Sequence, residues 1–144
     1  MIGPFLAAPP PPERRLVIVM SLPPPELSPN ARPHRLAKAK AVKAYRRTAW
    51  GYALASPFRN ARWPAAVAMV RAFFPDARGR DEDNIAAALK PVWDGIVSAG
   101  VLVDDRHLHH LPMGRGVDRA NPRLEIQLWE ARPEAPAAPS AGPA

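Results

Sequence analysis

Four aspartates in two pairs have the residue type and the spacing to hold a divalent cation. Asp81 and Asp83 are separated by one residue, and Asp104 and Asp105 are adjacent further along the chain. If the backbone at the first pair is extended, its two side chains point the same way. Two carboxylates about 4 Å apart repel by about 4 kcal/mol at an effective dielectric of about 20, so a converged group must bind protons or a cation. Ligands that are all oxygen favour Mg²⁺ or Mn²⁺ over Zn²⁺.

A cation held by these carboxylates suits phosphodiester hydrolysis, because it activates a water and neutralises the charge that develops on the phosphate. Lys90 follows Asp83 by about two helical turns and is suited to stabilising the scissile phosphate or orienting the water. A plainer interpretation stays open. Acidic residues at 81–83 also stabilise a helix N-terminus through its dipole, and Asp104 and Asp105 then lie in a solvated turn.

The charge of the chain is divided into a basic segment and an acidic segment. The formal net charge is +7, and residues 27–75 contain ten Lys and Arg but no Asp or Glu. Residues 76–105 reverse this balance, with seven acids against three bases. A basic surface beside an acidic pocket suits a protein that binds DNA phosphates and a cation, although a solvated charged face is the alternative. The residues that we predict to contact DNA are Asn30, Arg32, Arg35, Lys38, Lys40, Lys43 and Arg47.

Composition excludes several other kinds of protein. The sequence has no cysteine, which excludes a disulfide framework, a thiolate zinc site and a cysteine nucleophile. No apolar run approaches the ~20 residues that span a bilayer, and residues 1–8 lack the charged and apolar regions of a signal peptide. We therefore expect a soluble cytoplasmic protein with no membrane partner.

Periodicity predicts an α+β fold with the order β-α-β-α-β-β. We expect a mixed four-stranded sheet with two packed helices in a single domain over 14–132. Prolines are concentrated in 1–13 and 133–144, which we expect to be disordered tails. Pro91 should kink the second helix, and Gly114 to Gly116 should form a hairpin turn. The predicted strands are 15–22, 65–74, 107–113 and 122–129, and the predicted helices are 34–54 and 83–99.

Three motifs in this order resemble the RusA-type Holliday-junction resolvases, the crossover junction endodeoxyribonucleases of bacteria and prophages. The motifs are Asp81-x-Asp83-Asn84, Lys90-Pro-x-x-Asp94 and Ala99-Gly100-Val-x-x-Asp104-Asp105. The N-terminal part is also similar, with a strand that ends in Leu22-Pro23-Pro24, then Ser28-Pro29-Asn30 and a basic helix. The resemblance covers residues 15–130, and its specificity lies in the order and spacing of the motifs together.

The resemblance implies a homodimer that cuts four-way DNA junctions with Mg²⁺ or Mn²⁺. It implies that Asp81, Asp83 and Asp105 are catalytic metal ligands, that Asp104 assists them and that Lys90 is catalytic. This chain departs from the short family members between Asn84 and Lys90, where it is longer by about one helical turn. That difference bears more on Lys90 than on the carboxylates.

Two other functions fit parts of the sequence. A non-catalytic DNA-binding protein, such as a degenerate prophage relic, would keep the basic helix and would need no carboxylate cluster. An enzyme acting on another phosphorylated substrate, such as a nucleotide hydrolase, would need a closed small-molecule pocket and no long basic surface. DNA binding without metal separates the first from the second, and cleavage separates both from a junction nuclease.

Overall fold

The structure is a computed structural model that describes residues 9–32 and 34–132. Its strands are β1 (Leu16–Met20), β2 (Ala66–Phe74), β3 (Leu108–His110), β4 (Gly114–Val117) and β5 (Arg123–Glu130). Its helices are α1 (Arg35–Ala55), α2 (Glu82–Ala88) and α3 (Lys90–Ser98), with short 3-10 turns at η2 (Pro12–Arg14), η3 (Pro25–Leu27) and η4 (Asp105–His107). The predicted tails at 1–8 and 133–144 lie outside the described residues. Residues 12 and 13, which we expected to be disordered, belong to η2.

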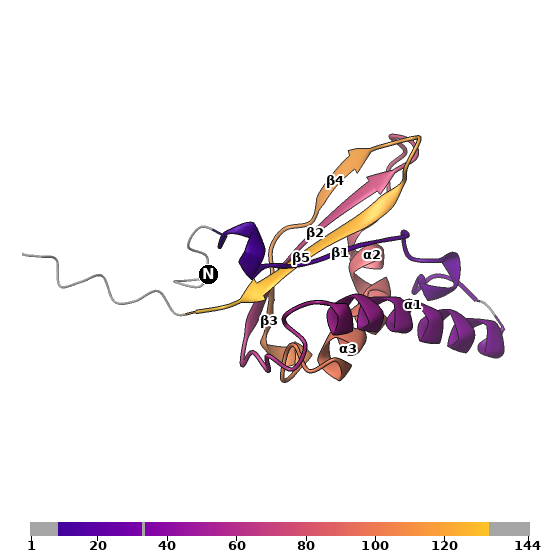
Figure 1. Ribbon diagram of the computed structural model, residues 1–144. Coiled ribbons are helices and arrows are strands. Elements are labelled where there is room, and N and C mark those ends of the chain that lie inside the picture. The colour runs from indigo at the N-terminus through magenta and orange to yellow at the C-terminus, as the bar shows by residue number, and fades with distance from the viewer. Residues whose placement is uncertain (1–8, 33, 133–144) are drawn as a thin grey trace, which may run out of the picture.

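The strands form one mixed sheet in the order β1-β5-β2-β3, and β4 also pairs with β2, further along it than β3. β5 runs antiparallel to both β1 and β2, whereas β3 and β4 run parallel to β2. Helices α1 and α3 pack on the sheet (Figure 1). The α+β class, the mixed sheet and the single domain are therefore confirmed.

The fifth strand, β4, lies where we predicted a hairpin turn, so that prediction was wrong. Gly114 and Gly116 pair with Arg71 and Phe73 of β2. A Cβ atom at Gly116 would lie 3.0 Å from the Phe73 ring, and one at Gly114 would lie 3.3 Å from the Arg71 side chain. These glycines allow β4 to approach β2 closely. A Gly-Arg-Gly sequence fits either this role or a turn, so the sequence alone did not separate the two.

The predicted second helix is divided in two. Leu89 ends α2 with φ −88° and ψ −1°, and α3 begins at Lys90 with Pro91 in its first turn. A proline at that position removes no helical hydrogen bond, because the first N–H groups of a helix have no intrahelical partner. The helix is interrupted near Pro91, but the break lies at Leu89, before Pro91, and does not arise from a lost hydrogen bond, so the predicted kink was wrong in position and cause. The break leaves α3 short enough for the chain to return past its start.

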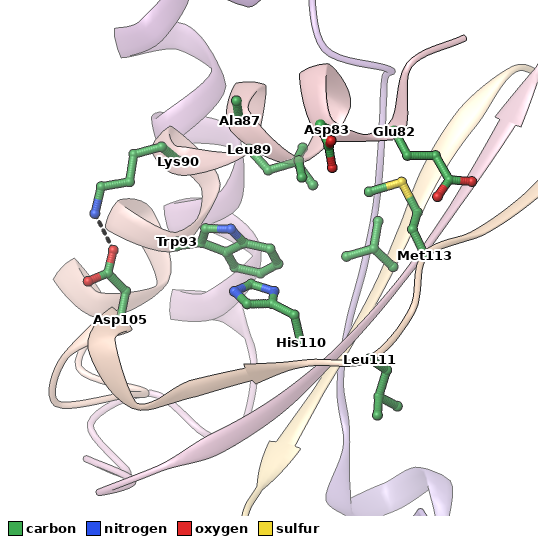
Figure 2. Close-up of a pocket in the computed structure, with 12 residues that line it drawn as sticks. Glu82, Asp83, Ala87, Leu89, Lys90, Trp93, Asp105, His110, Leu111 and Met113 are labelled. Atoms are coloured by element: carbon green, nitrogen blue, oxygen red, sulfur yellow. Dashed lines mark hydrogen bonds and ion pairs between the residues drawn. The ribbon is translucent and has the colours of Figure 1, made fainter. Parts of the chain in front are cut away.

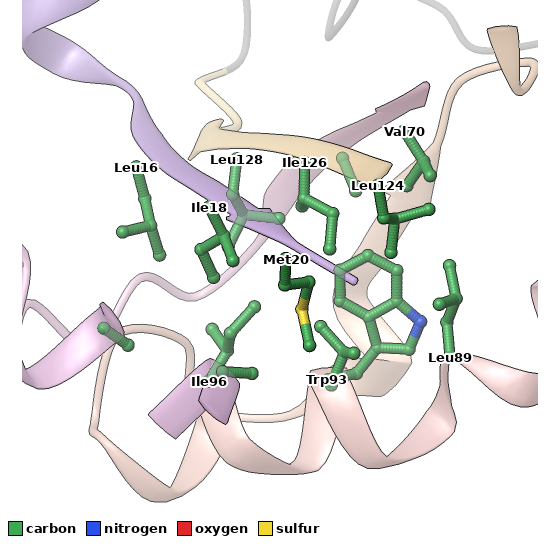
Figure 3. Close-up of a cluster of buried hydrophobic side chains, with 14 of the residues drawn as sticks. Leu16, Ile18, Met20, Val70, Leu89, Trp93, Ile96, Leu124, Ile126 and Leu128 are labelled. Carbon is green, nitrogen blue, oxygen red and sulfur yellow. The ribbon is translucent and has the colours of Figure 1, made fainter. Parts of the chain in front are cut away.

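The core lies between the sheet and the helices, as Figure 3 shows. Alternate residues of β1 and β5 are buried on this side, and the residues between them are not. The helical side is supplied by buried residues of α3, among them Val92, Trp93 and Ile96. Trp93 belongs to this core, and Trp129 is buried in a second, smaller cluster with Val67 and Ala131.

Gly95 of α3 sits where α3 crosses α1. A Cβ atom at this position would lie 2.5 Å from the Arg46 carbonyl oxygen and 3.0 Å from the Trp50 nitrogen. We expect Gly95→Ala to lower the free energy of unfolding by about 1–3 kcal/mol, because the two helix backbones must separate. Urea denaturation measures this effect. Gly79→Ala is the control, since its Cβ would meet nothing within 4 Å; equal midpoints for the two variants would contradict the prediction.

Candidate active site

A pocket of about 500 Å³ lies between α2 and α3 on one side and the segment from η4 to β4 on the other. It is lined by three residues that we predicted as catalytic, Asp83, Lys90 and Asp105. Figure 2 shows Lys90 and Asp105 together at one end of this pocket and Asp83 towards the other end. The structure thus brings to one cavity residues that come from α2, α3 and η4.

Lys90 is held between two carboxylates. Its Nζ contacts Asp105 Oδ2 and lies 3.2 Å from Asp94 Oδ1, one helical turn further along α3. The hydrogen bond to Asp105, followed by the one to Asp94, raises the pKa of Lys90. Lys90 therefore stays protonated at neutral pH and places a positive charge beside the pocket.

The turn after α3 returns the chain to Lys90. Gly100 has a φ of +78°, and a Cβ there would lie 2.7 Å from the Asn60 side-chain oxygen, so only glycine fits without strain. The backbone of Trp63 then holds the returning segment. Its backbone N–H donates to the Val101 carbonyl (2.8 Å), and its carbonyl accepts from the Val103 N–H (3.0 Å). These contacts position η4 and with it Asp105.

Asp81 and Asp83 do not face the same cavity, which corrects the prediction that their side chains point the same way. Asp81 is the N-cap of α2, and its Oδ1 accepts from the Asp83 N–H at 2.9 Å. It lines a separate pocket with Arg80 and Pro24. Alternation requires two extended residues, and Asp83 already lies in the first turn of a helix. The plainer interpretation, that the acids at 81–83 stabilise a helix N-terminus, therefore fits Asp81, which is itself the N-cap.

Asp104 is also directed away from the main pocket. Its carboxylate accepts from the Arg106 N–H at 2.8 Å and from Arg106 Nε at 3.0 Å. The backbone hydrogen bond from Arg106 lowers the pKa of Asp104. Asp104 lines a neighbouring depression together with Arg46, Asp94 and Asp105. Asp105 is therefore the one predicted carboxylate that lines both hollows.

The pocket carboxylates fit Mg²⁺ in chemical type. Within residues 9–32 and 34–132, no three His, Asp or Glu side chains are grouped as a metal site. Mg²⁺, however, is commonly held by one or two carboxylates, with waters and substrate phosphates supplying its other ligands. Asp83 and Asp105 offer such oxygens on the pocket wall.

The residues predicted to contact DNA lie on α1 and the loop before it. Asn30 and Arg32 are both exposed in this loop. His34 is the N-cap of α1, because its Nδ1 accepts from the Leu36 N–H at 3.2 Å. The exposed cations of α1 are Arg35, Lys38, Lys40, Lys43, Arg46 and Arg47.

Arg46 was not in our predicted set, yet it is the α1 residue that shares a depression with the acidic residues. Its Nη2 donates to Ser98 Oγ of α3 at 2.7 Å, and it lines the depression that Asp104 and Asp105 share. The spacing of charges along one helix shows which residues are exposed, but it does not show which of them a second helix approaches.

His110 is a second pocket residue outside the predicted set. Its ring packs edge-on against Trp93, with centroids 5.3 Å apart. Partial desolvation lowers the pKa of His110, which favours the neutral imidazole at pH 7. The pocket is thus lined by a protonated lysine, a neutral imidazole and carboxylates.

Comparison with known proteins gives a relative but no family. No family model matches the chain. An uncharacterized protein of Xylella fastidiosa (strain Temecula1 / ATCC 700964) is 38% identical over 96 residues, which are 61% of this chain. The matched region spans 60% of that relative. In the part of the chain that the structure describes, no helix has the length and apolar character needed to cross a membrane.

Proposed function

We propose that the protein is a metal-dependent endodeoxyribonuclease that resolves four-way DNA junctions in the cytoplasm, in DNA recombination or repair. The observation that supports this most is the pocket that Asp83, Lys90 and Asp105 line together. All three residues belong to the motifs that resemble RusA-type resolvases. The helix α1 presents exposed basic residues, as expected for a protein that binds phosphates. One of them, Arg46, lines the depression that Asp104 and Asp105 share.

The proposed reaction is hydrolysis of a phosphodiester bond. A bound Mg²⁺ or Mn²⁺ would activate water and neutralise charge on the phosphate, and Asp83 and Asp105 are the residues that would hold it. Lys90, protonated and 61% exposed at its side chain, binds a non-bridging phosphate oxygen and stabilises the negative charge that accumulates there. α1 contacts phosphates along the duplex without reading bases.

A homodimer fits this substrate. A four-way junction has two strands to cut, and a C2 dimer presents two equivalent sites to them. The homodimer is implied by the family resemblance, and sedimentation of the full chain tests it directly.

The experiment that tests the proposed function is cleavage of a labelled synthetic four-way junction. The reactions contain Mg²⁺, Mn²⁺ or a chelator, and a linear duplex of the same sequence is run beside them. We expect paired, symmetric nicks on the junction that require the metal and are absent from the duplex. Binding of the junction without cleavage in either metal would reject the proposal.

Two observations favour a second candidate, a structure-selective DNA-binding protein without catalysis. Asp81 is occupied as a helix cap, and the described carboxylates do not form a group of three. Such a protein would keep the basic surface of α1 and would bind junctions equally well with chelator. Cleavage distinguishes the two candidates.

The basic surface of α1 makes its own prediction. We expect the combined change Lys40→Gln, Lys43→Gln and Arg47→Gln to weaken junction binding and to reduce the dependence of log K on log salt by about 3, because three fewer counterions are released. All three side chains are at the surface, so the fold should be unaffected. Binding titrations between low and moderate salt measure the slope, and an unchanged slope would exclude α1 as the DNA surface.

A further inference from the structure

The far end of the sheet forms a projection that we call the arginine arm. It consists of residues 71–80 and 114–125, which include the end of β2, all of β4 and the start of β5. Figure 1 shows these strands continuing beyond the part of the sheet that α1 and α3 cover. The arm contains six arginines and no lysine, against three acidic residues. Arginine is the cation best suited to bidentate contact with phosphate.

The three acids of the arm are paired mainly with two of its arginines, and a third, Arg78, lies 3.8 Å from Asp76. Arg80 lies 3.0 Å from Asp76, and Arg123 lies 2.8 Å from both Asp118 and Glu125. Both of these arginine side chains are about four-fifths buried, with 19% and 20% exposure. They account for the internal cohesion of the arm and leave its other arginines uncompensated or weakly paired.

The remaining arginines face solvent. Among the described residues, Arg71 and Arg119 form no ion pair, and both are exposed. Arg115 is 40% exposed, and its contact with Glu82 is long, at 3.8 Å. The Arg71 guanidinium lies 5.7 Å from the centre of the Phe73 ring and that of Arg115 lies 5.5 Å from Phe74. Both distances are within the range of cation–π attraction, which helps to hold the two guanidinium groups at the surface.

The arm adjoins the Asp83 end of the pocket. Arg115 Nη2 donates to the Arg80 carbonyl at 2.8 Å, which ties β4 to the segment that leads into α2. Met113, which precedes β4, lines the pocket itself. Arg46 of α1 lies at the opposite, Asp105 end. The pocket is therefore flanked by two basic surfaces that different parts of the chain supply.

We propose that the arginine arm is a second DNA-contact surface, which binds backbone phosphates on the Asp83 side of the pocket while α1 binds those on the Asp105 side. The inference rests on the proposed function and adds to it the residues Arg71, Arg115 and Arg119. A branched DNA presents two duplexes that diverge from the point of cleavage, so one can lie on each surface. The contacts are to phosphates, so they position the DNA and carry no sequence preference.

The test is junction binding in chelator by the triple variant Arg71→Gln, Arg115→Gln and Arg119→Gln. We expect the dissociation constant for a four-way junction to rise at least tenfold and the salt slope to fall by about 3. The matched control changes three exposed arginines away from the arm, Arg14→Gln, Arg59→Gln and Arg132→Gln. Arg14 and Arg132 adjoin the ends of β1 and β5 that lie furthest from the arm. The control should bind within twofold of the unaltered protein.

A double variant guards against a folding defect. Arg71→Gln with Arg119→Gln breaks no ion pair of the described residues and leaves the Arg115 contacts intact, and we expect it to weaken binding at least threefold. If the unaltered protein binds and cuts junctions and the triple variant binds them equally well, the proposed role of the arginine arm is overturned. The proposed function is not affected by that result. Equal weakening by the control would also overturn the role of the arginine arm. An unaltered protein that does not bind DNA would instead reject the proposed function.

Discussion

Replacing Asp83 with asparagine is expected to abolish cleavage of the four-way junction while leaving junction binding within twofold. Asp83 lines the pocket with Lys90 and Asp105, and its carboxylate is one of two that would hold the cation there. Loss of a metal's stabilisation of the transition state costs several kcal/mol, which is about a thousandfold or more in rate. The asparagine has the same shape and still accommodates the first turn of α2, so the fold and the basic surfaces are retained.

The measurement is single-turnover cleavage with Mg²⁺, together with binding in chelator. Glu13→Gln, which also converts an exposed carboxylate to an amide, lies in η2 and should cut at the normal rate. A fully active Asp83→Asn variant would exclude the metal role. Loss of binding together with cleavage would show that Asp83 supports the structure of the DNA site instead.

The sequence predicts most of the sheet and the first helix because their signals are local. β1 is a continuous apolar run rich in Val, and in β5 Leu124, Ile126 and Leu128 alternate with other residues. The structure buries Leu16, Ile18 and Met20 against Leu124 and Ile126. The boundaries of α1 differ from the prediction by a single residue. β4 was missed because its pairing with β2 depends on Gly116 fitting against Phe73, a contact between residues distant in the chain.

The site was predicted in part, and what was missed depends on tertiary geometry. Asp83, Lys90 and Asp105 follow from the motifs, and the structure places them on one pocket. Asp81 was assigned a ligand role, yet the extended backbone that this required ends at the helix that Asp81 caps. Arg46 was passed over because its approach to Asp105 depends on how α1 crosses α3. Spacing along a chain indicates candidates, and packing between elements selects among them.

The longer segment between Asn84 and Lys90 has a simple structural consequence. Residues 85–88 of this segment belong to α2, which ends at Ala88, and Lys90 opens a separate helix. If one straight helix covered both segments, Lys90 would lie in the middle of that helix. The break instead puts Lys90 in the first turn of α3, where Asp105 can contact it after the chain returns. The greater length of this segment is thus compatible with the catalytic role proposed for Lys90.

Lys90→Met is expected to slow cleavage by about a hundredfold, while the dissociation constant for the junction rises less than threefold. The methionine keeps an unbranched side chain of similar length but removes the cation that stabilises charge on the phosphate, an interaction of the kind worth ~10²–10³ in rate. Lys90→Arg, which retains the charge, should recover part of the rate. Single-turnover rates in saturating DNA and binding in chelator separate the two effects.

The contacts of Lys90 decide how these results are interpreted. The raised pKa that Asp105 and Asp94 impose on Lys90 means that the cation is present throughout the neutral range, so the deficit of Lys90→Met should not change between pH 6 and pH 9. A purely positioning role, in which Lys90 only orients Asp105, predicts that additional Mg²⁺ restores the rate. A direct role at the phosphate predicts that additional Mg²⁺ does not restore the rate, and this is the outcome we expect. The Lys90 side chain lines the pocket and is mostly exposed, so it can turn from Asp105 to an arriving phosphate.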